Sequence, residues 1–133
     1  MFKSCFYFLF LFVFIGCNSN KNTIQFNGVY QSSKIDKNYY YYIRFYKNDS
    51  VIDVSSSGKP RHLKRWFKKE KEDIPKGTYY CKNDSLFFKT KSSSGIVEYK
   101  GKLIRGKLFL NHNSKINGHK SLNTYTFKRI NFE

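Results

Sequence analysis

The sequence predicts a mainly β domain: an antiparallel up-and-down β-barrel of about eight short strands with one short helix, or alternatively a β-sandwich. Aromatic residues make up 20% of the chain and alanine is absent, which favours strands over a helix bundle. Short runs of aromatic and β-branched residues recur along the chain. Clusters of Asn, Asp, Gly and Ser separate these runs, as hairpin turns would.

The first predicted strands form a hairpin. A strand begins at residues 28–31, and a second run at residues 39–46 has strong β propensity on both of its faces, so we expect it to be central. Residues 47–50, Lys-Asn-Asp-Ser, form a turn because Asn and Asp tolerate the left-handed conformation. Residues 51–54 then return antiparallel to the second strand.

A short helix, or a structured lid, is predicted after the polar loop at residues 55–60. Leu63, Trp66 and Phe67 follow the spacing i, i+3 and i+4 among lysines, which is typical of one apolar helix face. We expect Pro75 to end this segment.

The second half of the chain predicts further hairpins. Residues 82–85 repeat the earlier turn sequence, and Arg105-Gly106 and Asn117-Gly118 are further turn signals. The intervening segments alternate between apolar and polar residues, as half-buried strands do. The predicted strands are residues 77–81, 86–90, 96–104, 107–111 and 122–130.

The first residues resemble the signal of a bacterial lipoprotein. Lys3 precedes an apolar run at residues 6–15, and Gly16-Cys17 follows it. Ten residues rising about 1.5 Å each cover only about half of a ~30 Å hydrocarbon core, so the run is too short to span a membrane permanently. The resemblance implies cleavage before Cys17 and a diacylglyceryl group on its thiol. An ordinary signal peptide with a coincidental cysteine is the alternative.

This resemblance sets the expected organisation and location. Residues 1–16 would be the signal peptide, residues 17–25 a lipidated flexible tether and residues 26–133 a single domain. The protein would be lipid-anchored in the cell envelope. Asn18, rather than aspartate, follows the cysteine, which by similarity to Gram-negative sorting rules indicates the outer membrane.

Residues 26–130 also resemble a lipocalin, on the basis of Gly28-Val29-Tyr30 in the first strand and Arg129 in the last. The pattern is similar to small lipocalin-like lipoproteins of Bacteroidetes. In lipocalins an aromatic residue after that glycine packs across the closed end of the barrel, and a basic side chain from the last strand covers it. The resemblance therefore implies that Tyr30 and Arg129 form a barrel-closing pair, with tyrosine in place of the usual tryptophan.

The chain is strongly basic, with 25 Lys and Arg against 9 Asp and Glu and a net charge of +16. A tethered envelope protein rarely meets nucleic acid, so we expect anionic lipid, rather than nucleic acid, to be the partner of this charge. The alternative is a solvated surface whose lysines reflect an AT-rich genome.

No catalytic set, cofactor or metal site is expected. The three histidines, His62, His112 and His119, lie in polar segments without carboxylates at metal-ligand spacing. Cys81 would be a buried, inert thiol. Glu98 is expected on the outside of its strand beside a lysine, or alternatively inside a cavity.

The favoured function is a membrane-anchored binding module that holds a small apolar or amphipathic ligand in an aromatic-lined interior. Trp66, Tyr99 and Tyr125 are the candidate ligand-binding residues. Trp66 would cover the barrel mouth, or alternatively pin the predicted helix to the core. The alternative function is a structural or interaction lipoprotein that uses its basic surface to contact anionic envelope components or a protein partner. We do not expect an enzyme.

Overall fold

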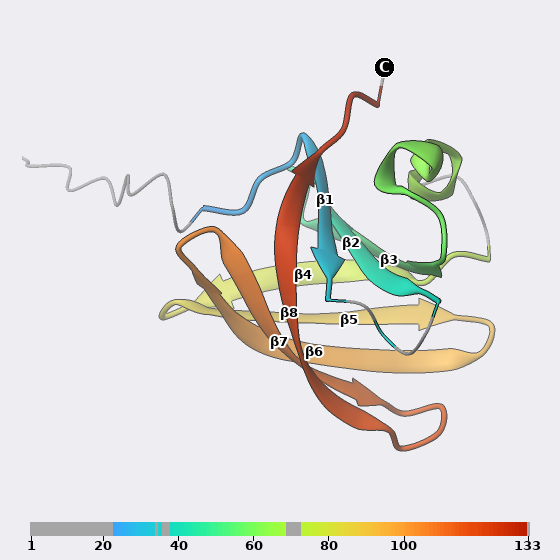
Figure 1. Cartoon of the computed structure of the whole chain (residues 1–133). Helices are drawn as coiled ribbons and strands as arrows, with labels where there is room; N and C mark the ends of the chain where they lie inside the picture. The colour runs from blue at the N-terminus through green and yellow to red at the C-terminus, as the bar shows by residue number, and fades with distance from the viewer. Residues whose placement is uncertain (1–22, 34, 36–37, 69–72, 133) are drawn as a thin grey trace, which may run out of the picture.

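The protein folds into a closed antiparallel β-barrel (Figure 1). The computed structural model describes residues 23–33, 35, 38–68 and 73–132. The strands of this described part pair in chain order, and β1 pairs with β8 to close the barrel. The predicted up-and-down barrel is confirmed, and the alternative sandwich does not form. The strands are β1 (Gly28–Ser32), β2 (Tyr40–Phe45), β3 (Ser50–Ser56), β4 (Lys76–Lys82), β5 (Ser85–Ser92), β6 (Gly95–Ile104), β7 (Lys107–Ser114) and β8 (Lys120–Arg129).

The predicted signal peptide, Cys17 and the tether as far as residue 22 lie outside the described residues. The structure therefore concerns the barrel domain and the short stretch that leads into it.

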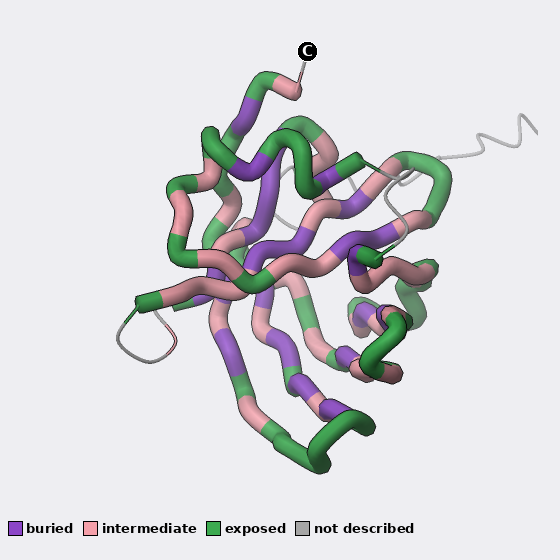
Figure 2. The backbone as a smooth tube through the Cα atoms, turned by 90° about the vertical axis from the view of Figure 1, so that its right-hand side faces the viewer, coloured by how far each residue is buried: buried purple, intermediate pink, exposed green. Residues whose placement is uncertain are grey.

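Side chains alternate between the two faces of the barrel wall. In β5, Leu86, Phe88 and Thr90 are buried, whereas Lys89 between them is exposed. Figure 2 shows the same alternation of buried and more exposed positions along several strands. A slip of one residue in any hairpin would turn the apolar set outward, so the alternation fixes the register.

The core has two parts, one inside the barrel and one outside it. The interior core consists of Tyr30, Ile43, Phe45, Val51, Leu86, Phe88, Tyr99, Leu108, Leu110 and Tyr125. The outer core lies on the outward side of β1, β2 and β3 and consists of Val29, Tyr42, Ile52, Leu63, Phe67, Ile74 and Ile130. Residues 58–68, in the connection that follows β3, cover this wall (Figure 1), and we call them the lid.

The lid contains two 3₁₀ turns, η1 (Pro60–His62) and η2 (Lys64–Phe67), where the sequence predicted one helix or a structured lid. A segment this short gains too few hydrogen bonds to sustain an α-helix alone, so packing decides its shape. Leu63 and Phe67 are 2% and 1% exposed and hold the lid against the wall. Trp66 is 38% exposed, so it is not the residue that pins this segment.

Two glycines allow the strands to approach closely where the barrel bends. A Cβ on Gly101 in β6 would lie 1.7 Å from the carbonyl oxygen of Phe109 in β7. A Cβ on Gly28 would lie 2.1 Å from the carbonyl oxygen of Lys128, at the seam where β1 meets β8. Only glycine fits such positions, so these residues permit the closure of a small barrel.

The predicted turn residues adopt the conformations that their chemistry favours. Asp49 has φ 67°, and Asn83 and Asp84 have φ 49° and 65°. Arg105 and Gly106 both have positive φ, 51° and 78°, as a type I′ hairpin turn requires. The short turns that the sequence predicted therefore join the strands as expected.

Candidate functional site

One end of the barrel is apolar and closed by aromatic rings. Tyr30 is 1% exposed, and its ring lies 5.6 Å from that of Phe45 and 5.2 Å from that of Phe127. The Tyr30 hydroxyl accepts a hydrogen bond from the backbone N–H of Gln25 at 3.0 Å. Arg129 pairs with Gly28 in the strand ladder, and its side chain is exposed. The aromatic contacts at Tyr30 thus come from Phe45 and Phe127.

The other half of the interior is polar, and its centre is the carboxylate of Asp53 in β3. Asp53 Oδ2 accepts a hydrogen bond from the Tyr99 hydroxyl at 2.6 Å and another from Thr90 Oγ1 at 2.7 Å. Tyr125 is fully buried, and its hydroxyl has no partner among the described residues. Tyr99 and Tyr125, two of the predicted ligand-binding residues, therefore both belong to the barrel interior.

Burial sets the protonation of this interior group. It raises the pKa of the Asp53 carboxyl, and the hydrogen bonds from Tyr99 and Thr90 offset part of the rise. Burial and the nearby Asp53 carboxylate raise the pKa values of Tyr99 and Tyr125, so both phenols stay neutral donors. Burial likewise lowers the pKa of His112. The sequence did offer a signal for Asp53, because Val51 faces the interior and the residue two positions later must do the same.

A large hollow lies outside the barrel. Large side chains of the interior core fill the lumen around Phe45 and Leu110. A hollow of about 920 Å³ instead lies over the outward face of β4 to β8, and we call it the outer groove. This hollow offers space for a ligand on the outer wall, whereas the sequence predicted a site in an aromatic-lined interior.

A row of outward side chains crosses the outer groove at right angles to the strands. The pairing register aligns Tyr80, Phe87, Lys100, Asn111 and Leu122 on five consecutive strands. The Tyr80 and Phe87 rings stack with centroids 5.2 Å apart, and Lys100 Nζ lies 5.4 Å from the Phe87 ring centre. Tyr80 is 61% exposed, so this aromatic pair presents apolar surface to solvent.

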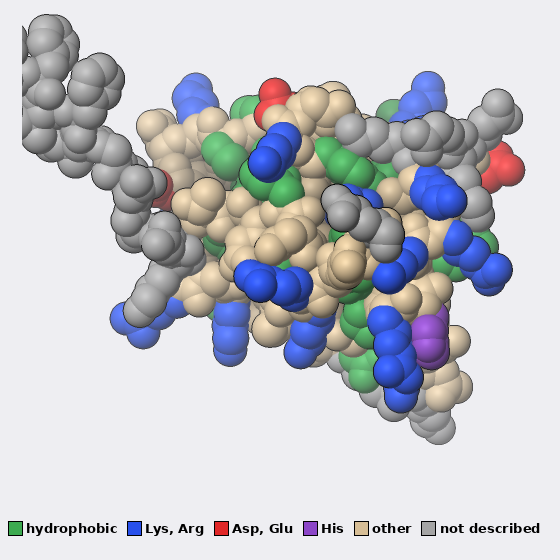
Figure 3. All heavy atoms as spheres, turned by 90° about the horizontal axis from the view of Figure 1, so that it is seen from above, with side chains coloured by type: hydrophobic (Ala, Val, Ile, Leu, Met, Phe, Trp, Pro, Cys, Tyr) green, Lys and Arg blue, Asp and Glu red, His purple; other side chains and the backbone are tan. Residues whose placement is uncertain are grey.

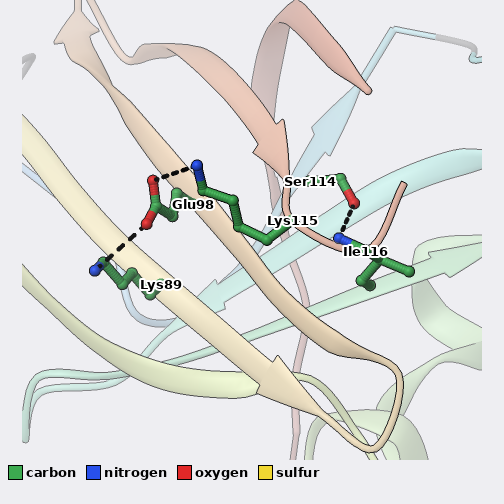
Figure 4. Close-up of polar contacts among 5 residues, drawn as sticks. All are labelled: Lys89, Glu98, Ser114, Lys115 and Ile116. Atoms are coloured by element: carbon green, nitrogen blue, oxygen red, sulfur yellow. Dashed lines mark hydrogen bonds and ion pairs between the residues drawn. The ribbon is translucent and has the colours of Figure 1, made fainter. Parts of the chain in front are cut away.

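A second row beside it is charged. It contains Glu98, which lies on the outside of its strand, as predicted. Glu98 Oε1 lies 3.4 Å from Lys89 Nζ, and Glu98 Oε2 lies 4.0 Å from Lys115 Nζ (Figure 4). The hydrogen bond from Ile116 N–H to Ser114 Oγ shapes the turn that carries Lys115. These ion pairs are exposed and contribute little to stability.

The outer groove is strongly positive. Of the described residues, one acid, Glu98, lines it against the lysines Lys76, Lys89, Lys91, Lys100 and Lys120, which leaves five minus one, or +4. Basic side chains also project around the face of the barrel seen in Figure 3, where acids are few. The groove therefore combines an apolar floor with a cationic rim, an arrangement that suits an anion with an apolar part.

Trp66 lies apart from this groove and from the polar interior. It belongs to η2 on the outward side of β1 to β3, with the Arg65 guanidinium carbon 5.4 Å from its ring centre. The structure thus separates the three predicted ligand-binding residues. Tyr99 and Tyr125 belong to the interior core, Tyr99 also lines the outer groove, and Trp66 lies in the lid.

Cys81 was expected to be buried, and this prediction was wrong. Its side chain is exposed near the end of β4, two residues from the hairpin turn, although it pairs with Leu86 of the interior core. Apolar neighbours in the sequence could not reveal this position.

The described residues contain neither a metal-binding cluster nor a membrane-spanning helix. No group of three or more His, Cys, Asp and Glu among them could hold a metal ion. No helix in this part of the chain combines the length and apolar character needed to cross a bilayer. Models of known protein families, curated proteins and solved structures gave no match to the chain.

Proposed function

We propose that the protein is a lipid-anchored binding module of the cell envelope that holds a small amphipathic anion in the outer groove. The observation that carries this proposal is the stacked Tyr80–Phe87 pair within a hollow lined by five lysines and one glutamate. The sequence led us to expect an apolar or amphipathic ligand. The lining of the outer groove favours the amphipathic class, and we propose the outer wall, rather than the lumen, as the site.

Each part of such a ligand finds a complementary surface. Its apolar part would lie on the two rings and on the aliphatic stems of the lysines, while its anionic head would meet their ammonium groups. The outer groove, at about 920 Å³, has the size of a small-molecule site, which typically measures ~300–1,000 Å³. Lys100 is central, because it lies over Phe87 and next to Asn111 in the aligned row.

The anchor would keep this groove close to a membrane. Lipidation of Cys17 would tether the barrel through residues 17–25, which reach at most about 30 Å when extended. A lysine near an anionic leaflet contributes about 1 kcal/mol. Cleavage before Cys17 would remove only one charged residue, Lys3, so the net charge of 24 minus 9, or +15, favours a position beside anionic lipid. The outer membrane is the location that we propose.

Calorimetric titration of the purified protein with decanoate, and with neutral decyl maltoside of the same chain length, tests the ligand class. We expect decanoate to bind more tightly and its affinity to fall as salt is added. Lys100→Glu reverses the charge beside Phe87 and should cost about 2 kcal/mol, or roughly thirtyfold in affinity. Lys107→Glu makes the same charge change on the exposed start of β7, outside the groove, and should change affinity less than about twofold.

Two results would contradict the proposal. One is equal affinity for decanoate and decyl maltoside, which would mean that the lysines take no part. The other is equal loss in the Lys100→Glu and Lys107→Glu variants, which would mean that net charge, rather than the groove, attracts the ligand.

Contact with a larger anionic surface is a second candidate function, and one observation favours it. The aligned row continues to Leu122, which is 68% exposed, and Ile104, 47% exposed, lines a smaller adjoining hollow of about 250 Å³. Flat apolar surface of this kind suits a membrane or a protein partner better than a small ligand. Leu122→Ser should weaken binding to anionic vesicles but leave decanoate binding unchanged. Loss of decanoate binding in this variant would mean that the small ligand and the larger anionic surface use the same residues.

A further inference from the structure

A second hollow, of about 440 Å³, lies between the lid and the end of β8. Lys59, Arg61 and Lys64 line it from the lid, and Lys128 and Arg129 line it from β8. Pro60, Ile130 and Asn131 complete the lining. We call it the basic hollow; it shares no lining residue with the outer groove.

The charge of the basic hollow is concentrated. Of the residues that the structure describes, five cationic side chains and no acid line it, so these carry +5, against +4 for an outer groove of about twice its volume. Cations gathered in this way repel one another, and an anion between them relieves that repulsion. The positive charge of the basic hollow therefore favours the binding of an anion there.

Buried contacts hold both sides of the basic hollow in place. On the lid side, His62 N–H donates to the Lys59 carbonyl at 2.9 Å, and the adjacent Leu63 is only 2% exposed. On the other side, Ile130 is 7% exposed, and its N–H donates to the Asn27 carbonyl at 3.1 Å. The backbone that carries the cations is thus fixed before any ligand arrives, which lowers the entropic cost of binding.

We propose that the basic hollow binds the phosphomonoester headgroup of an anionic membrane lipid. Two arginines offer planar, forked donors that match phosphate oxygens, and three lysines add point charges. A phosphomonoester carries more negative charge than a carboxylate and has three terminal oxygens, so it engages more of these donors at once. A single carboxylate would leave most of the +5 charge uncompensated.

The position of the hollow identifies a membrane lipid as the source of the phosphate. Arg129 pairs with Gly28, and Ile130 bonds to Asn27, so the hollow adjoins the point where the tether enters the barrel. This step rests on the proposed lipidation of Cys17, which brings that side of the barrel toward the headgroups. Phosphates of the host leaflet would then lie within reach of the lid and of β8.

Titration with glycerol 3-phosphate, a soluble form of the headgroup, tests the site without a membrane or an anchor. We expect saturable binding to one site. Replacing both arginines, Arg61→Gln with Arg129→Gln, should weaken it at least about tenfold, because charge-assisted hydrogen bonds are lost. The matched control, Lys47→Gln with Lys107→Gln, removes the same charge elsewhere and should retain affinity within about twofold. Binding that does not saturate, or that survives in the double arginine variant, overturns the proposal.

Vesicles distinguish a lipid phosphate from a soluble one. Protein carrying Cys17→Ser should bind phosphatidylcholine vesicles that contain phosphatidic acid, and addition of the double arginine change should abolish most of this binding. If glycerol 3-phosphate binds at the hollow but these vesicles are bound equally with and without the arginines, the membrane-lipid assignment is wrong. Decanoate affinity should be unchanged in the double arginine variant, so failure here and failure of the outer groove are separate results.

Discussion

Replacement of Asp53 by asparagine should change how the stability of the barrel depends on pH. Burial raises the pKa of Asp53 in the folded protein, whereas in the unfolded chain it returns to about 3.9. The unfolded state therefore loses this proton first as pH rises. The free energy of unfolding should fall by up to about 1.4 kcal/mol per pH unit from about pH 4 until the pH passes the folded-state pKa.

The Asp53→Asn variant cannot ionise at this position, so it escapes that loss. At low pH it should be the less stable protein, by about 1 kcal/mol, because an amide replaces the protonated carboxyl in the bonds to Tyr99 and Thr90. At higher pH the free energy of unfolding of the variant should equal and then exceed that of the wild type. His112 contributes a slope of opposite sign below about pH 6.5, because burial lowers its pKa. That slope is common to both proteins and cancels in the difference.

Urea unfolding followed by circular dichroism between pH 3 and pH 8 measures this difference. Ile52→Val serves as the control, since trimming a side chain that is 1% exposed should cost about 0.5–1.5 kcal/mol at every pH. Parallel curves for wild type and Asp53→Asn would show that Asp53 does not resist ionisation in the fold. A relative gain of wild-type stability with rising pH would show that the fold stabilises the Asp53 anion.

Further predictions concern the lid, the barrel wall and the anchor. Phe67→Ala should destabilise the fold by about 3–5 kcal/mol in urea unfolding and Trp66→Ala by at most about 0.5 kcal/mol, and the reverse order would refute our description of the lid. Gly101→Ala should cost about 1–3 kcal/mol or prevent folding, because its Cβ would meet the Phe109 carbonyl oxygen, and unchanged thermal stability would contradict the close approach. Cys17→Ser should move the protein from the membrane fraction to the soluble fraction, whereas a variant that still sediments with the envelope in high salt would exclude lipid anchoring.

The strands and turns were predictable because local chemistry determines them. Alternation along β5 and β6 specified which side chains face inward, and Asn83-Asp84 and Arg105-Gly106 specified where the chain reverses. Consecutive hairpins with short turns leave few topologies other than a meander. Closure between β1 and β8 joins the two ends of the sheet. The strand pattern left a sandwich as the alternative to this closure, and the lipocalin resemblance added support for the barrel.

Features that depend on tertiary packing were predicted less well. The apolar spacing of the lid residues gave the correct buried pair, Leu63 and Phe67, but also included Trp66, which is partly exposed. Two 3₁₀ turns formed where a helix was the first expectation. Cys81 was expected in the core because its sequence neighbours are apolar, but it is exposed near the end of β4.

The outer groove illustrates why a site on a sheet is difficult to predict. Tyr80, Phe87 and Lys100 come from three strands, and only the pairing register brings them side by side. The sequence showed the lysines and the aromatic residues, but not the curvature that gathers them around one hollow. It also led us to place the aromatic surface inside the barrel, where large side chains already fill the space.

The location of bound decanoate tests the proposed function most directly. Backbone amide resonances recorded during a decanoate titration should shift in a contiguous patch around Tyr80, Phe87, Lys100 and Asn111, with little change in residues that face the lumen. Shifts centred on the inward-facing neighbours of Asp53, with none on the outer wall, would place the ligand inside the barrel and contradict the outer groove as the binding site.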